Sequence, residues 1–132
     1  MDVRQIEADW APRILGLLRI VSALLFMMHG SQKLLGIPPS NHSPELFSLL
    51  WFAGFLELVG GFFVLIGLFT RPIAFILSGQ MAVAYWMAHA PQSFFPALNG
   101  GDAAILFCFI FLYLVFAGPG AFSIDGARQK PS

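Results

Sequence analysis

Residues 46–69 read LFSLLWFAGFLELVGGFFVLIGLF, an apolar run interrupted near its middle by one carboxylate, Glu57. A helix needs about 20 apolar residues to cross the hydrocarbon core of a bilayer, and this run meets that length. An acidic side chain at mid-membrane depth costs roughly 2.5–3.5 kcal/mol on insertion scales, so such residues normally face a bundle interior and find a partner. We therefore expect a transmembrane helix whose Glu57 faces protein.

Three glycines support this orientation of Glu57. Gly54 and Gly61 lie three residues before and four residues after Glu57, with Gly60 beside them. Residues at this spacing share one helix face. Small residues on a face let a second membrane helix approach closely. Gly54, Gly60 and Gly61 are therefore predicted helix-packing residues.

The composition indicates a membrane protein. The chain has 132 residues, is 58% hydrophobic with a mean hydropathy of +0.77, and has only 11% charged residues. These values lie outside the usual range for soluble domains. Seven basic residues balance seven acidic ones, so no excess of positive charge points to nucleic acid. The single cysteine, Cys108, excludes a disulfide or a dithiol redox pair within one chain.

Turn-forming residues divide the chain into four apolar segments, which predicts an all-α, integral membrane four-helix bundle. A polar lead is predicted over residues 1–12 and a polar tail over 119–132, flanking a membrane domain over 13–118. The predicted spans are residues 14–35, 46–69, 73–89 and 102–117.

The basic residues predict the orientation of this bundle. Four spans place both termini on one side, and all but one of the basic residues then fall on that side; the exception is Lys33. Cytoplasmic loops carry an excess of lysine and arginine. Both termini are therefore predicted to be cytoplasmic.

A polar stripe on the first span suggests a partner for Glu57. Arg19, His29 and Lys33 fall on one face of the helix, together with Ser22 and Phe26. Arg19 is predicted to pair with Glu57, and Gln80 on the third span would complete a buried polar clamp. The alternative is that Arg19 extends to the cytoplasmic headgroups without a partner in the protein.

A second group of polar residues is expected near the outer ends of the helices. It forms a candidate ligand pocket made of His29, Lys33, Tyr85, His89, Asn99 and Asp102. Histidine can titrate, ligate a metal or form hydrogen bonds with a quinone carbonyl. The alternatives are a quinone or similar ligand, a metal or haem, or histidines satisfied by loop carbonyls and water. No Cys/His cluster with zinc spacing is present, and no metal site is assigned.

Motifs along most of the chain resemble those of the DoxX family of small four-helix membrane proteins. They span residues 13–126, in this order: Arg19 with Phe26, His29-Gly30 and Lys33-Leu34; Gly54, Glu57, Gly60-Gly61 and Gly67-Leu68-Phe69-Thr70-Arg71; Ala82, Ala84-Tyr85 and His89-Ala90-Pro91; Phe94-Phe95-Pro96 and Asn99-Gly100-Gly101-Asp102; Ala117-Gly118-Pro119-Gly120, Ser123 and Asp125. Two positions depart from the family pattern. Asp102 stands where glutamate is more common, and Gln92-Ser93 replaces a common lysine and glycine.

The resemblance implies an association with membrane redox chemistry, because relatives include the large subunit of a thiosulfate:quinone oxidoreductase. The leading hypothesis is a multi-pass protein of a bacterial-type inner membrane that acts as a quinone-interacting or anchoring subunit of a redox system. A membrane quinone is the candidate cofactor, and the bilayer, other redox proteins or a second copy of the chain are the candidate partners. Catalysis stays open; an enzymatic role would be that of a quinone-linked oxidoreductase subunit. The alternatives are a non-catalytic interaction or transport-assisting protein, and a metal-handling protein using His29 and His89.

Overall fold

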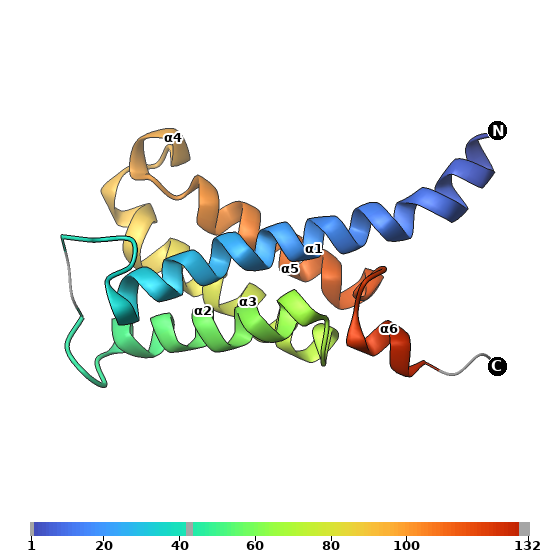
Figure 1. Cartoon of the computed structure of the whole chain (residues 1–132). Coiled ribbons are helices and arrows are strands. Elements are labelled where there is room, and N and C mark those ends of the chain that lie inside the picture. The colour runs from blue at the N-terminus through green and yellow to red at the C-terminus, as the bar shows by residue number, and fades with distance from the viewer. Residues whose placement is uncertain (1, 42–43, 130–132) are drawn as a thin grey trace.

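The computed structural model describes residues 2–41 and 44–129, and all regular structure within them is helical. Figure 1 shows the arrangement of the helices. The elements are α1 (Val3–Leu35), α2 (Leu49–Ile66), α3 (Thr70–Ala84), the π-helical turn η1 (Tyr85–His89), the 3₁₀ turn η2 (Ala90–Gln92), α4 (Pro96–Asn99), α5 (Asp102–Ala117) and α6 (Ile124–Arg128).

Three helical stretches of the described chain are long and apolar enough to cross a membrane: Val3–Leu35, Leu49–Ile66 and Thr70–Gln92. The fourth apolar helix, α5, has 16 residues. Large apolar side chains such as Leu24, Phe62, Phe75 and Phe109 point outward and are about half exposed or more. Apolar exposure on this scale is typical of a surface that faces lipid rather than water.

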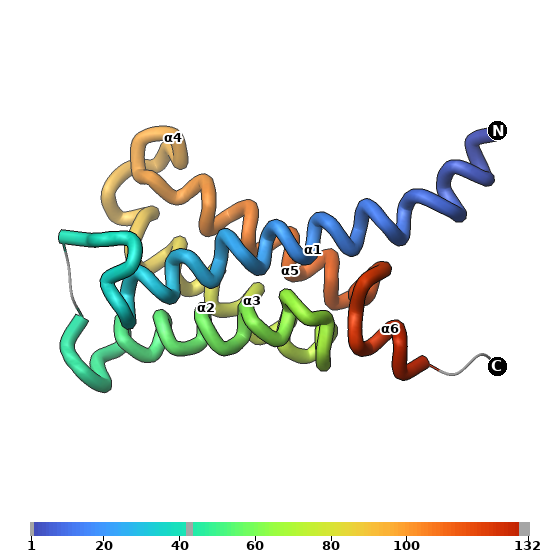
Figure 2. The backbone as a smooth tube through the Cα atoms, viewed as in Figure 1, coloured from blue at the N-terminus to red at the C-terminus, as the bar shows by residue number. Residues whose placement is uncertain are grey.

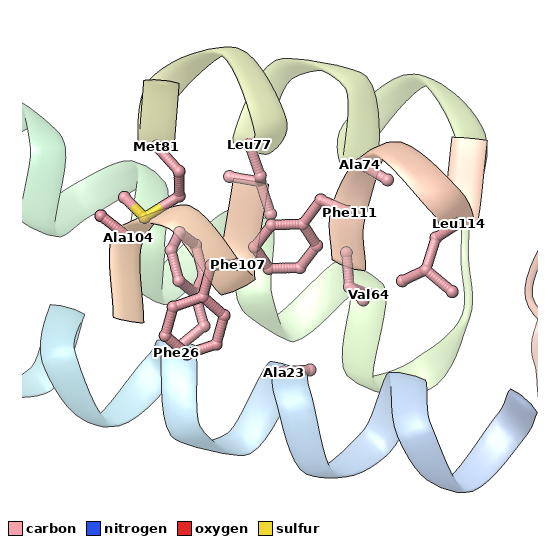
Figure 3. Close-up of a cluster of buried hydrophobic side chains, with 10 residues drawn as sticks. All are labelled: Ala23, Phe26, Val64, Ala74, Leu77, Met81, Ala104, Phe107, Phe111 and Leu114. Atoms are coloured by element: carbon pink, nitrogen blue, oxygen red, sulfur yellow. The ribbon is translucent and has the colours of Figure 1, made fainter. Parts of the chain in front are cut away.

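The helices pack mainly as two pairs, α1 with α2 and α3 with α5. Buried apolar side chains from all four helices join the pairs (Figure 3). The ring of Phe26 on α1 lies 5.3 Å from that of Phe107 and 4.9 Å from that of Phe111, both on α5. This aromatic cluster connects the two pairs across the centre of the molecule.

Glycines set the close approach of α1 and α2. A Cβ atom added at Gly54 would lie 2.8 Å from Cβ of Lys33, and one at Gly61 would lie 2.6 Å from Cγ of Met27. Gly60 points elsewhere, toward Leu77 of α3. Gly30 of α1 makes the least adaptable of these contacts, because its added Cβ would meet the backbone of α2. The helix-packing face predicted around Glu57 therefore serves two neighbours, α1 and α3.

The helix α1 extends further than the predicted first span. It begins at Val3, where the side chain of Asp2 accepts a hydrogen bond from the backbone of Gln5 and the side chain of Gln5 accepts one from Asp2. This reciprocal cap stabilises the first turn. The described part of the predicted polar lead is thus helical and continuous with the span; Met1 lies outside the described residues.

The predicted C-terminal tail is docked on the helices as far as it is described, and residues 130–132 lie outside that part. After α5 the chain crosses the end of the bundle to α6 (Figure 2). The N–H of Ala121 donates to the carbonyl of Pro12 at 2.9 Å. The carboxylate of Asp125 accepts from the backbone N–H groups of Phe69 and Thr70 at 2.9 and 2.8 Å. Asp125 therefore caps the start of α3 from the other end of the chain.

Candidate functional site

Arg19 is fully buried and lies at the docked C-terminal segment. Its guanidinium donates to the carbonyls of Pro119, Ala121 at 3.0 Å, Phe122 at 2.7 Å and Leu65 at 3.4 Å. The predicted pairing of Arg19 with Glu57 is therefore wrong. Fourteen residues separate Arg19 from Lys33, which corresponds to about 21 Å along a helix, so Arg19 lies far from the level of Glu57. Arg19 holds the C-terminal segment in place.

Lys33 is the partner of Glu57. Its Nζ donates to both carboxylate oxygens of Glu57, at 2.6 and 2.7 Å. The Glu57 side chain is only 3% exposed, whereas that of Lys33 is 27% exposed. Because α1 and α2 are antiparallel and meet at Gly54, the last turn of α1 reaches the middle of α2. The ion pair removes the uncompensated charge that Glu57 alone would bring into an apolar interior.

Gln80, the third member of the predicted clamp, links α3 to α2. Its Nε2 donates to the carbonyl of Ala53 at 3.2 Å. Its Oε1 is buried and has no hydrogen-bond partner among the described residues. Gln80 thus lies in the same region as Glu57, whereas Arg19 does not.

A cavity of about 830 Å³ opens between the helices at the level of the ion pair. This volume is in the range of small-molecule sites. Most of its walls are apolar. Its lining residues come from α1, α2, α3, η1 and the start of α5: Phe26, His29, Lys33, Leu49, Leu50, Phe52, Ala53, Leu56, Glu57, Ile76, Gly79, Gln80, Met81, Val83, Ala84, Met87, Ala88, His89, Gly100, Ala103, Ala104 and Phe107.

Three of the six predicted pocket residues line this cavity: His29, Lys33 and His89. His29 makes an edge-on contact with Phe107, with ring centroids 6.2 Å apart, and no hydrogen bond to the described residues. The two histidines lie on different walls, one from α1 and one from η1. Both histidines therefore line one cavity, and their role in binding a ligand stays a prediction.

Tyr85 and Asn99 lie behind His89 and hold it in place. Asn99 is buried; its side chain donates to the hydroxyl of Tyr85 at 3.2 Å and to the carbonyl of Ser93 at 3.0 Å. The carbonyl of Asn99 contacts Nδ1 of His89 at 3.0 Å. Tyr85 and Asn99 are supports of the pocket wall and not part of its lining.

Asp102, the sixth predicted residue, is exposed in the first turn of α5 and is not among the lining residues. A carboxylate there interacts favourably with the positive end of the helix dipole. The side chain therefore serves the helix start rather than the pocket.

The helix bearing His89 widens where it approaches the cavity. Residues 85–89 form a π turn, closed by a hydrogen bond from the N–H of Ala90 to the carbonyl of Tyr85. Such single turns occur frequently at functional sites, because they change the direction of the following side chains. No signal in the sequence predicted the π turn.

The cavity wall also includes residues that the sequence did not single out. Gly79 is the clearest, because an added Cβ there would meet no atom within 4 Å. The sequence carried no signal for this wall, because the open space beside Gly79 is visible only once the helices are packed. Within the described chain, no three His, Cys, Asp or Glu side chains are placed to hold a metal ion together.

The fold and the cavity define a small, all-helical membrane protein with a mainly apolar cavity between its helices that contains a few polar side chains. The chain belongs to the DoxX family, whose model matches residues 14–90, and this confirms the resemblance. An uncharacterised protein of Haemophilus influenzae is 43% identical over 127 residues, covering 92% of this chain and 95% of the relative. No solved structure matches the chain.

Proposed function

We propose that the protein binds a membrane quinone in the cavity and serves as a quinone-interacting or anchoring subunit of a redox system in a bacterial-type inner membrane. In this proposal α1, α2, α3 with its two short turns, and α5 form a four-span bundle with both termini in the cytoplasm. The observation that carries the proposal is the cavity itself, an apolar space of about 830 Å³ that contains the Lys33–Glu57 pair.

The walls of the cavity fit the two parts of a quinone. Leu50, Phe52 and Leu56 of α2 line it together with Ile76 and Val83 of α3, and these side chains suit an apolar ring and tail. The polar groups are few and gathered on the side chains of Lys33, Glu57, Gln80, His29 and His89. A mainly apolar pocket with a few polar groups is typical of small-molecule sites, where the polar groups fix the orientation of the ligand.

Electron transfer in this proposal belongs to a partner protein. The chain has one cysteine, Cys108, which lies 3.6 Å from the hydroxyl of Ser78 on the contact between α3 and α5. It has no second thiol with which to exchange electrons through a disulfide. The part assigned to this chain is therefore to hold the quinone within the bilayer while a partner subunit, or a partner bound to a second copy, supplies the electrons.

The test is a binding titration with the purified chain in detergent, using a short-chain benzoquinone and the intrinsic tryptophan fluorescence as readout. Gly79→Phe places a ring in the open space of the cavity, and Gly79→Ala is the matched control. We expect saturable binding in the wild-type chain and in Gly79→Ala, and loss of binding in Gly79→Phe. Absence of saturable binding, or equal binding by Gly79→Phe, would contradict the proposal.

A further inference from the structure

The hydrogen bond of His89 fixes the role of each of its ring nitrogens. Nδ1 lies 3.0 Å from the carbonyl oxygen of Asn99, and a carbonyl oxygen only accepts. Nδ1 must therefore carry the proton and donate. In the neutral ring this leaves Nε2 as an acceptor. No described residue donates a hydrogen bond to Nε2, and His89 lines the cavity.

The amide of Gln80 is oriented by the same reasoning. The carbonyl of Ala53 can only accept, so the amide atom at 3.2 Å from it is the nitrogen. The oxygen, Oε1, is then the free end, buried and without a donor among the described residues. A buried acceptor without a donor carries a desolvation cost, which a ligand that donates a hydrogen bond would remove.

Donors to a ligand are fewer than acceptors in this cavity. Two of the three N–H groups of the Lys33 ammonium are directed to the two oxygens of Glu57, which leaves one. His29 can donate from one nitrogen and accept at the other. Beyond these, two residues of the cavity lining each carry an acceptor that is unpaired within the described chain, Nε2 of His89 and the buried Oε1 of Gln80.

From this imbalance we infer that the cavity selects a ligand with hydroxyl donors, so that a hydroquinone binds more tightly than the corresponding quinone. His89 and Gln80 are the residues that determine this specificity. A quinone has two carbonyl acceptors and leaves both protein acceptors unpaired, whereas a hydroquinone has two O–H groups to donate to them. The inference rests on the proposed function, since it names the redox form that the proposed quinone site takes.

Preferential binding of the reduced form changes the redox behaviour of the bound couple. By linkage, a ligand bound more tightly when reduced is easier to reduce in the site than in the bilayer. Each tenfold preference corresponds to about 30 mV for a two-electron couple. The midpoint potential of the bound couple should therefore be higher than that of the free couple.

The experiment compares three ligands on the purified full chain under anaerobic conditions. They are a short-chain benzoquinone, its hydroquinone, and the dimethyl ether of that hydroquinone, which has the same ring without O–H donors. Loss of one neutral hydrogen bond changes affinity by about tenfold. We expect the hydroquinone to bind about tenfold or more tightly than the quinone and the ether.

Two variants test whether Gln80 and His89 cause the preference for the hydroquinone. Gln80→Met and His89→Phe each remove one acceptor, so each should weaken hydroquinone binding by about tenfold. Binding of the quinone should change much less. The matched control is Gln92→Met, which removes an exposed glutamine outside the cavity and should leave all three affinities unchanged. The affinities for the three ligands are compared as ratios within each variant. A general loss of folded protein lowers binding of all three ligands alike and leaves these ratios unchanged.

The outcomes separate the two proposals. If all three ligands bind with equal affinity, or the quinone binds best, the selection of hydroxyl donors is overturned while quinone binding stands. If the ligand ratio is the same in Gln80→Met and His89→Phe as in the wild type, their assigned role is overturned. If none of the three binds, the proposed function fails and the inference fails with it.

Discussion

At the level of single residues, the two buried charges of the membrane region are stabilised in different ways. Glu57 meets an opposite charge, the ammonium of Lys33. Arg19 meets backbone carbonyl oxygens from the C-terminal segment and the end of α2. A buried charge needs either a partner of opposite sign or several well-placed dipoles. The first solution lies at the cavity, beside the last turn of α1, and the second lies near the middle of α1, at the docked C-terminal segment, so the two charges have separate structural roles.

Removing Lys33 should destabilise the protein more than removing Glu57. Lys33→Met leaves a nearly fully buried carboxylate without a counter-charge, a type of change that costs about 3–5 kcal/mol. Glu57→Gln leaves an ammonium that is partly exposed and can turn toward the headgroups, so a smaller loss is expected. Thermal unfolding in detergent measures both variants. Glu7→Gln, at an exposed position of the same helix α1, is the control and should have almost no effect.

The double variant completes this test. Lys33→Met combined with Glu57→Gln removes both charges, so it should be more stable than Lys33→Met alone. Residues in one ion pair couple in this way, whereas independent sites add. Additive losses, or a larger loss from Glu57→Gln than from Lys33→Met, would refute the pairing as the reason that the carboxylate is tolerated.

The sequence predicted that Glu57 faces protein but named the wrong partner. Helix periodicity placed Arg19 and Lys33 on one face of α1, yet periodicity does not fix the register between two helices. The register depends on where the two backbones approach most closely. For α1 and α2 this close approach lies at Gly30 and Gly54. The sequence could group His29, Lys33 and His89, which line one cavity, because each lies near the end of its helical stretch. The π turn and the docking of residues 118–125 were not, because they depend on contacts distant in sequence.

At the level of helices, Gly30 should be the most sensitive position of the α1–α2 contact. A Cβ there would lie 2.6 Å from the backbone nitrogen of Leu58 and 2.8 Å from the carbonyl oxygen of Gly54. Backbone atoms cannot rotate away, so Gly30→Ala must separate the helices, and overpacking of this kind typically costs about 1–3 kcal/mol. The control is Gly79→Ala, also inside a helix, where the added Cβ meets nothing within 4 Å.

Thermal unfolding of the two glycine variants gives a direct comparison. Both substitutions replace glycine by alanine within a helix, so the change in helix propensity is the same. We expect Gly30→Ala to lower the unfolding temperature and Gly79→Ala to leave it unchanged or raise it. Equal effects would mean that the close approach of α1 and α2 contributes little to stability.

The start of α3 should be stabilised in a pH-dependent way by Asp125. Partial burial acts to raise the pKa of this carboxyl, but hydrogen bonds from the backbone N–H groups of Thr70 and Phe69, with the charge of Arg128, hold the pKa below its ordinary value of 3.8. A carboxyl whose pKa is lowered by folding stabilises the fold when ionised. The stabilisation is complete above the ordinary pKa and is lost as the pH falls through the lowered one.

Stability of the wild type and Asp125→Asn across this range measures the effect. The wild type should be more stable by about 1 kcal/mol at neutral pH, the usual size of a helix cap. The difference should shrink as the pH is lowered below about 4. Asp102→Asn, at an exposed carboxylate of α5, is the control and should lose less at neutral pH. A difference between wild type and Asp125→Asn that does not depend on pH would contradict an ionic cap.

At the level of the whole molecule, the two ends of the bundle differ. One end is closed by the C-terminal segment, which Arg19 and Asp125 hold against α1, α2 and α3. The other end carries the loop after α1, the short helix α4 and the cavity wall formed by η1 (Figure 1). Helix α5 is about 24 Å long at 1.5 Å per residue, less than the hydrocarbon thickness. Phe94, Phe95 and Leu98 just before it are exposed, and in the proposed four-span bundle they would extend its apolar surface into the interface.

The proposed orientation predicts which of these ends is cytoplasmic. In Figure 1 the start of α1 and α6 lie at the same end, and four crossings would put both in the cytoplasm together with Arg71. Replacing Cys108, the only cysteine, with alanine gives a background for single cysteines. A membrane-impermeant maleimide should label Glu45→Cys and Gln92→Cys in intact cells, but Glu7→Cys and Arg128→Cys only after the membrane is opened. Labelling of Glu7→Cys without labelling of Arg128→Cys would mean that an odd number of helices crosses, and labelling of both in intact cells would reverse the orientation.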